Sequence, residues 1–149
     1  ETTYKVHFIT ISDVHIGSQT EFGYRLSNDS GSSFETGYHF ASQRGIADGS
    51  FQERRSEGQD SARLCGDIDE DSHSLANGFM YMYSAGDSSN YTYTTSHMTF
   101  IDFQDLTAVE FGSQLYDHKE QISGIRFGAG TGVTALTSAT ISLYGIRNF

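Results

Sequence analysis

Two segments of the sequence carry residue types that could bind a metal ion. In FITISDVHIGS, Phe8 to Ser18, one residue separates Asp13 from His15 near the end of a predicted strand. In CGDIDED, Cys65 to Asp71, Asp67 opens an acidic run. A carboxylate and an imidazole on one face of a strand suit a hard divalent ion, and such an ion polarises a phosphate ester. Asp13, His15 and Asp67 are therefore candidate ligands of one metal.

These segments resemble the first two motifs of the calcineurin-like metallophosphoesterases, Asp-x-His and Gly-Asp-x-x-Asp. The Gly-Asn-His-Asp or Gly-Asn-His-Glu motif of that family does not occur after Asp71, and His97 and His118 stand in SHM and DHK rather than in Gly-x-His. The resemblance implies an α/β sandwich with helical crossovers, whereas this sequence has few helical segments. On a strand, the face that Asp13 and His15 share can simply be solvent. We therefore predict no enzyme, with no catalytic, cofactor-binding or metal-binding residues.

Two further features near residue 65 have ordinary structural interpretations. The acidic residues from Asp67 to Asp71 could offer oxygen ligands to Ca²⁺, but the glycine-centred spacing of an EF-hand is missing, which favours a solvated loop. Cys65 is the only cysteine. A single cysteine cannot form an internal disulfide or a cysteine-rich zinc site, and we expect the Cys65 side chain to be a buried apolar thiol.

Four tyrosines form the main candidate binding set. Tyr81 and Tyr83, and likewise Tyr91 and Tyr93, are spaced by two, so each pair shares a face of its strand. Buried, they would fill a core or a subunit interface; exposed, they could stack on sugar rings. We favour the core or interface and keep the glycan platform as the alternative.

Four arginines fall into two groups. Arg25 and Arg126 each lie within an apolar strand, so we expect each to pair with a carboxylate or to lie at a subunit interface. Arg54 and Arg55 stand among glutamates and predict an exposed patch of ion pairs.

Composition narrows the class of protein. The chain has 149 residues, the size of a single domain (1–149), with 11 Phe, 9 Tyr, 16 Gly and no Pro, which favours strands joined by glycine turns. A net charge of −10 is unsuited to binding nucleic acid. No apolar stretch reaches the roughly 18 residues that span a bilayer, so we predict no membrane insertion. The chain opens with Glu1, which predicts a processed product or a piece of a longer protein.

Alternation of apolar and polar residues predicts an all-β protein. About eight or nine strands recur along the chain, which is typical of an antiparallel β-sandwich of jelly-roll type. Residues 43–60 are polar and predict a long loop or excursion. The runs Ile122 to Phe127 and Ala139 to Ile146 flank the glycine-rich AGTG and predict a closing hairpin, with Leu143, Tyr144 and Ile146 buried. We expect the first and last strands to be neighbours.

The order of these strands resembles a β-sandwich module found in virion proteins of tailed bacteriophages. The resemblance spans residues 4 to 146. It rests on Tyr4-Lys5-Val6-His7-Phe8, on Gly23-Tyr24-Arg25-Leu26-Ser27 with the turn Asp29 to Ser33, on Gly37-Tyr38-His39-Phe40-Ala41, and on the closing strands that end in Leu143-Tyr144-Gly145-Ile146.

The resemblance implies a structural role at the surface of the virion, as a capsid decoration or a fibre or tail component. Its partners would be other virion proteins and copies of itself, arranged as the homotrimer that fibres and decorations often form. An adhesin that recognises a host-surface glycan is the alternative function. No cofactor is implied.

Overall fold

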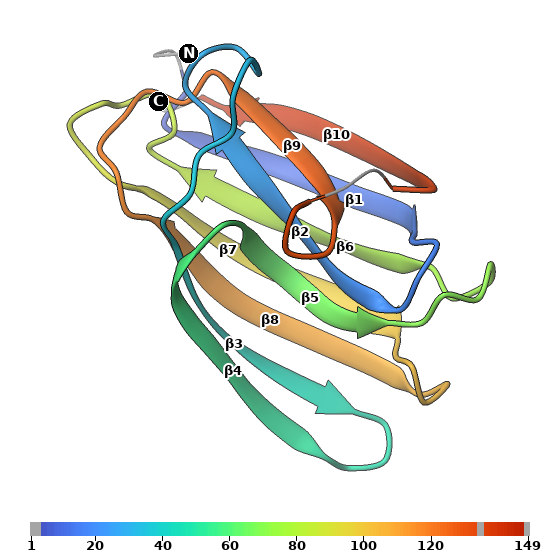
Figure 1. The fold of residues 1–149 in the computed structure, drawn as a ribbon. Coiled ribbons are helices and arrows are strands. Elements are labelled where there is room, and N and C mark those ends of the chain that lie inside the picture. The colour runs from blue at the N-terminus through green and yellow to red at the C-terminus, as the bar shows by residue number, and fades with distance from the viewer. Residues whose placement is uncertain (1–3, 134–135, 148–149) are drawn as a thin grey trace.

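The computed structural model describes residues 4–133 and 136–147, and within these ranges the chain forms ten strands and no helix (Figure 1). In chain order the strands are β1 (Val6–His15), β2 (Thr20–Ser27), β3 (Tyr38–Ile46), β4 (Phe51–Gln59), β5 (Ala62–Ile68), β6 (Ala76–Tyr83), β7 (Thr92–Ile101), β8 (Thr107–Tyr116), β9 (Gly124–Ala129) and β10 (Ser138–Ile146). In the described residues, no helix is long and apolar enough to cross a lipid bilayer.

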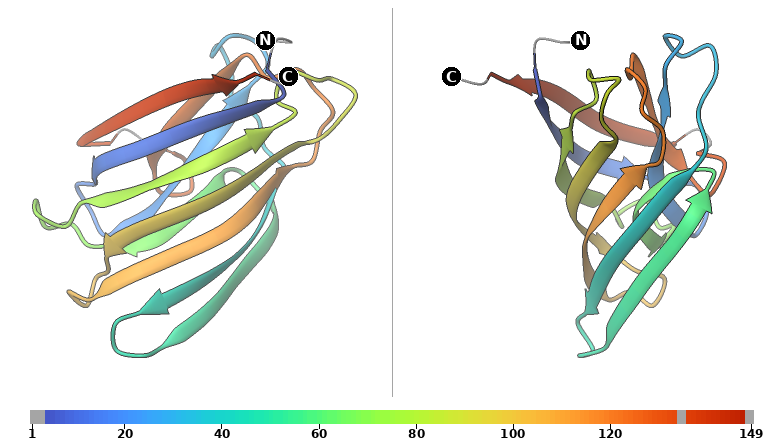
Figure 2. Two further views of the ribbon diagram at one scale, coloured as in Figure 1. Left: turned by 180° about the vertical axis from the view of Figure 1, so that it is seen from behind. Right: turned by 90° about the vertical axis from the view of Figure 1, so that its left-hand side faces the viewer.

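The strands form two antiparallel sheets of unequal size (Figure 2). Seven strands make the large sheet in the order β10-β1-β6-β7-β8-β3-β4, and three make the small sheet in the order β5-β2-β9. The small sheet packs through β5 against β7, β8 and β3. The prediction of an all-β, antiparallel β-sandwich is confirmed, although with ten strands rather than eight or nine.

The core lies between the two sheets. Alternation along the strands brings Met80 and Met98 of the large sheet, and Phe22 and Leu64 of the small sheet, to this interface, where each is at most 1% exposed. Cys65 is also buried here, as expected, and burial raises the pKa of its thiol well above the ordinary value.

The prediction of a loop over residues 43–60 is wrong. Residues up to Ile46 continue β3, and Phe51–Gln59 forms β4, which pairs with β3 in antiparallel register. β4 is the outermost strand of the large sheet and most of it is exposed. An edge strand can be polar on both faces, so it lacks the apolar alternation that identifies an interior strand.

The predicted closing hairpin is also wrong, although its two strands exist. β9 pairs with β2 in the small sheet, whereas β10 pairs with β1 in the large one. Residues 130–137 separate β9 from β10, which is longer than an ordinary hairpin loop and lets the chain change sheets. The pairing of β1 with β10 confirms that the first and last strands are neighbours.

The last strand is not part of the core, contrary to expectation. Leu143, Tyr144 and Ile146 are 59%, 53% and 40% exposed. β10 lies at the edge of the large sheet. β1 and β6 separate it from β7, β8 and β3, the strands against which β5 packs. Among the described residues, Tyr144 faces the outer side of the sheet, which no second layer covers, and Leu143 lines a cavity with Ile125 of β9 instead of packing in the core.

Candidate functional site

The outer face of the large sheet, turned away from the small sheet, is unusually rich in aromatic side chains. Along β6, Met80 and Met82 point into the core, so the intervening Phe79, Tyr81 and Tyr83 point outward. In β7 every second residue from Thr92 to Phe100 is buried, which turns Tyr93 and His97 outward. Period-two geometry thus places an aromatic layer opposite the core.

Six of these rings form a continuous series, which we call the aromatic row: Tyr144, Phe8, Tyr81, Phe79, His97 and Phe111. They come from five neighbouring strands, β10, β1, β6, β7 and β8. The ring centroids lie 6.2 Å apart for Phe8 and Tyr144, and 4.9 Å apart for Phe8 and Tyr81.

Phe79 continues the aromatic row to His97 at 5.7 Å, and His97 continues it to Phe111 at 6.3 Å. Phe79 and Phe111 are 38% and 42% exposed, respectively. An apolar strip of this kind on a protein surface is a candidate site of contact with another molecule.

The structure brings three of the four predicted tyrosines together. Tyr81 stacks on Tyr83 with centroids 6.4 Å apart, and Tyr83 lies directly opposite Tyr93 in the register of β6 and β7. Tyr91 is separate because it precedes β7, and its ring packs under the Lys119 ammonium at 5.2 Å.

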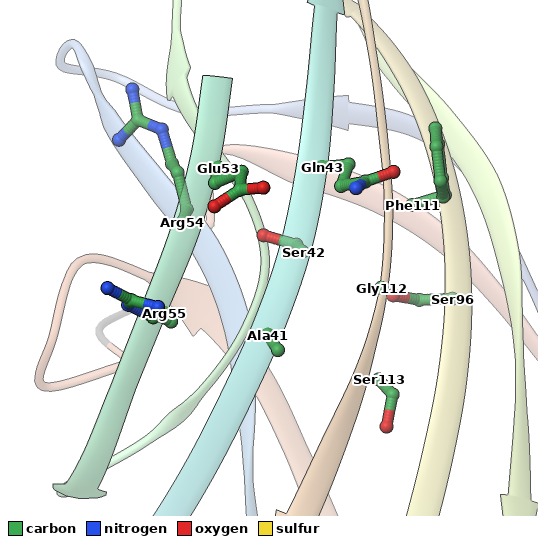
Figure 3. Close-up of a pocket in the computed structure, with 10 residues that line it drawn as sticks. All are labelled: Ala41, Ser42, Gln43, Glu53, Arg54, Arg55, Ser96, Phe111, Gly112 and Ser113. Carbon is green, nitrogen blue, oxygen red and sulfur yellow. The ribbon is translucent and has the colours of Figure 1, made fainter. Parts of the chain in front are cut away.

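A groove of about 540 Å³ crosses the outer face beside the end of the aromatic row (Figure 3). Arg54, Ser42, Gly112 and Ser96 lie in register across four strands, β4, β3, β8 and β7. Alternation sends the side chains of Arg54, Ser42 and Ser96 toward the inner side of the sheet, and Gly112 has no side chain. The outer surface therefore forms a depression along this row of residues. Outward side chains of the neighbouring positions, such as Gln43 and Phe111, form its walls.

The walls of this groove are chemically mixed. Phe111 supplies an exposed ring, while Gln43, Glu53 and Arg55 supply an amide, a carboxylate and a guanidinium, all exposed. An aromatic surface beside hydrogen-bonding groups of both kinds suits a polar ligand with apolar C–H faces, such as a sugar.

Arg25 and Arg126 lie directly opposite one another on β2 and β9 of the small sheet. Arg25 donates from Nε to the Glu35 carbonyl oxygen at 3.1 Å and from Nη2 to that of Phe34 at 2.5 Å. The Arg126 guanidinium lies 4.1 Å from the centroid of the Phe34 ring. Both arginines thus anchor residues 34–35 to the small sheet, and no carboxylate partner is seen in the described part of the chain.

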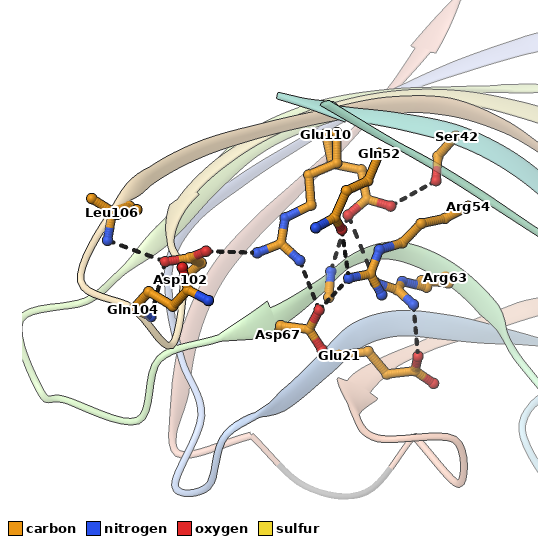
Figure 4. A network of polar contacts seen from close by, with 12 residues as sticks. Glu21, Ser42, Gln52, Arg54, Arg63, Asp67, Asp102, Gln104, Leu106 and Glu110 are labelled. Carbon is orange, nitrogen blue, oxygen red and sulfur yellow. Dashed lines mark hydrogen bonds and ion pairs between the residues drawn. The ribbon is translucent and has the colours of Figure 1, made fainter. Parts of the chain in front are cut away.

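Charged groups also gather between the sheets, in what we call the ionic cluster (Figure 4). Arg44, only 1% exposed, donates to Asp67 at 2.7 Å and to the fully buried Asp102 at 3.2 Å. Arg54 also pairs with Asp67. The prediction of an exposed Arg54 is therefore wrong: this side chain reaches inward and only Arg55 lies at the surface.

The second half of the ionic cluster is centred on Glu110. This buried carboxylate accepts hydrogen bonds from Ser42 Oγ at 2.6 Å and from the Gly66 backbone N–H at 3.2 Å. Arg63 lies between Glu110, at 3.8 Å, and Glu21, at 3.6 Å. The ionic cluster thus ties β3, β4 and β8 of the large sheet to β2 and β5 of the small one, and each of its carboxylates lies against at least one of its arginines.

The three candidate metal ligands do not form a metal site. Asp67 is occupied by Arg44 and Arg54; partial burial acts to raise its pKa, but Arg54 and Arg44 outweigh burial and hold the pKa below its ordinary value. Asp13 is exposed, and His15 Nε2 lies 3.4 Å from the Glu70 carbonyl oxygen. No group of three His, Cys, Asp or Glu in the described residues is arranged to hold a metal ion.

The acidic residues after Asp67 stabilise their own loop. Asp69 accepts a hydrogen bond from Ser74 Oγ at 2.9 Å, and Asp71 accepts one from the His73 backbone N–H at 2.8 Å. The predicted solvated loop is confirmed for Glu70 and Asp71, which are exposed, but Asp67 belongs to β5 and to the ionic cluster.

Sequence reasoning missed Phe8, Phe79, His97 and Phe111 as functional candidates. Each lies on a strand with a clear period of two, so the signal was present within each strand. Only the register of β1, β6, β7 and β8 shows that the four rings lie in one continuous row.

Comparison of the chain with models of protein families, with curated proteins and with solved structures finds no match.

Proposed function

We propose that this protein is a non-enzymatic structural component of a tailed-phage virion, located at the particle surface, that works by packing against other virion proteins and copies of itself. The observation that carries the proposal is the aromatic row, which runs over five strands of a rigid sheet. Aromatic side chains dominate the energetics of protein interfaces, because they bury much apolar area at little cost in conformational entropy.

Two other features support a binding role rather than catalysis. The charged residues between the sheets pair with one another, and the motif residues Asp13, His15 and Asp67 are not assembled. The sequence resemblance supports the phage assignment, and it covers strands from β1 to β10.

Immunogold electron microscopy tests the location. Antibody raised against the chain should label purified particles of the phage that encodes it, and electron cryomicroscopy of the same particles should show the aromatic row against a neighbouring subunit. Particles that lack the chain would contradict the proposal.

A paired variant tests the surface. Phe79→Ser with Phe111→Ser should reduce the number of copies per particle by about tenfold or more, since two central aromatic contacts of an interface are removed. Thr95→Ser, an exposed change on the same face, is the matched control and should leave occupancy unchanged.

Glycan recognition is a second candidate function, and the groove beside Phe111 is the observation that favours it. On a glycan array, binding should be lost with Phe111→Ala, which removes the ring that lines the groove, while Tyr91→Ala and Tyr93→Ala should have little effect because neither tyrosine lines the groove. If the array gives no signal and the protein is found on particles, glycan recognition is contradicted and the structural role is the remaining candidate.

A further inference from the structure

β10 has the features of an unprotected strand edge. It is paired with β1 on one side only, so the backbone N–H and C=O groups of its other side have no strand partner among the residues that the structure describes. Its sequence, SATISLYGI, contains no charged residue and no proline. Natural proteins usually block such edges with charges, proline or bulges, because an open edge pairs with another strand.

The opposite edge of the same sheet is blocked in this way. β4 carries Glu53, Arg54, Arg55 and Glu57, and its Gly58 has a φ of +67°, which interrupts regular extension. The two edges of one sheet therefore differ: β4 repels an incoming strand and β10 accepts one. This contrast makes β10 the edge of the sheet at which another strand can pair.

We propose that β10 pairs with β10 of a second copy of this chain, antiparallel and about a two-fold axis perpendicular to the sheet. Such an axis places the outer faces of the two sheets on the same side of the dimer. An outward residue of β10 must therefore lie opposite an outward residue of the other copy, and an inward residue opposite an inward one. Pairing over the whole strand, Ser138 to Ile146, then places Ser142 opposite Ser142. This inference does not rest on the virion assignment, and it proposes a two-fold dimer in place of the homotrimer that the resemblance implies.

This register matches the exposed side chains of β10. On the inner face Ile141, which is 36% exposed, lies opposite Leu143 of the other copy. The two-fold axis repeats this pair, so the interface contains it twice. On the outer face Tyr144 meets Thr140, which extends the aromatic row toward the second copy. Aliphatic and aromatic–threonine pairs of this kind stabilise antiparallel strands.

Charge explains why this edge is suited to self-pairing. Each copy carries a net charge of −10, so two copies repel one another over most of their surface. β10 carries no charged side chain, so pairing there places no like charges directly opposite one another, and salt screens the remaining repulsion. Raising the ionic strength should therefore strengthen the dimer.

Sedimentation equilibrium on the full chain tests the proposal. The wild-type chain should show twice the mass of one copy. Ser142→Lys puts two ammonium groups opposite one another on the axis and should weaken the dimer about tenfold or more. Thr99→Lys adds the same charge to an exposed position of the outer face away from the edge, and should remain dimeric.

Cysteine cross-linking tests the register. Ser142→Cys should form an intermolecular disulfide under mild oxidation, whereas Glu53→Cys on the blocked edge should not; Cys65 is buried and does not interfere. A monomer at every concentration, a dimer that Ser142→Lys leaves intact, a trimer, or equal cross-linking at both edges would each overturn the proposal. Labelling of phage particles is independent of all these outcomes.

Discussion

At the scale of single residues, the ionic cluster decides how the two sheets are joined. Asp102 is fully buried, and it accepts hydrogen bonds from Arg44 and from the backbone N–H groups of Gln104 and Leu106. A buried ion pair adds little net stability over an apolar pair of the same size. Removing one partner is costly, however, because the other charge then stays buried without compensation.

Asp102→Ala should therefore lower the free energy of unfolding by about 3–5 kcal/mol. The loss includes the two backbone N–H groups that Asp102 satisfies. Urea denaturation measures the change, with Glu57→Ala, an exposed position on β4, as a control expected to stay within about 0.5 kcal/mol. A loss no larger than that of the control would show that water replaces the carboxylate.

Asp67 makes stability depend on pH in a defined direction. Its pKa in the folded state lies below the ordinary value, so its contribution is complete above the unfolded pKa of about 4 and is lost as the pH falls through the lower, folded value. Asp67→Asn should be less stable than the wild type at pH 7, and the difference should shrink below about pH 4.

Asn is the suitable replacement because Asp67 has a φ of +56°, which Asn tolerates better than most residues. The difference in stability is measured from the urea unfolding midpoints of the wild type and Asp67→Asn between pH 7 and pH values below about 4. A constant difference at all pH values would mean that the charge of Asp67 is not responsible.

At the scale of elements, β8 contributes to both the ionic cluster and the aromatic row. Its inward Glu110 belongs to the ionic cluster, and its outward Phe111 ends the aromatic row. Gly112 follows these two residues directly in the strand. A Cβ there would stand 2.6 Å from the Ala41 carbonyl oxygen and 2.6 Å from the Ser42 Cβ, which is too close for either atom.

Gly112→Ala should consequently force β3 and β8 apart and destabilise the protein by about 1–3 kcal/mol. Thermal or urea unfolding checks this against Ser113→Ala, a change at the next position, whose side chain is exposed. If both variants unfold alike, the two strands yield more easily than the packing indicates.

The elements also show where sequence patterns are informative. Interior strands such as β6 and β7 bury one face and expose the other, and their period of two was visible in the sequence. Edge strands carry no such signal, which is why β4 was mistaken for a loop. β10 does alternate, but alternation does not say whether a second layer covers the strand, so its apolar residues were wrongly assigned to the core.

At the scale of the whole molecule, the core acts as one unit between two sheets, with Cys65 inside it. The thiol is buried and its pKa is raised by that burial, so the reactive thiolate is absent in the folded protein.

Cys65 should therefore resist a thiol reagent such as dithionitrobenzoate in the native state and react fully in denaturant. Its reaction rate should follow the global unfolding equilibrium, because β5 is packed against β3, β7 and β8 and is joined to the large sheet by the ionic cluster. Rapid labelling under native conditions would indicate that β5 separates from the large sheet independently.

The sequence by itself determined what is local: an acidic, helix-poor chain, strands with a period of two, tyrosine pairs that share a face, and a single cysteine with no partner. These follow from side-chain alternation and composition, which need no knowledge of neighbours. The tertiary structure decided which strand joins which sheet, that β10 stays exposed, and that rings from five strands form one row. Those features depend on strand pairing between residues far apart in the chain, and alternation within one strand does not encode its partner.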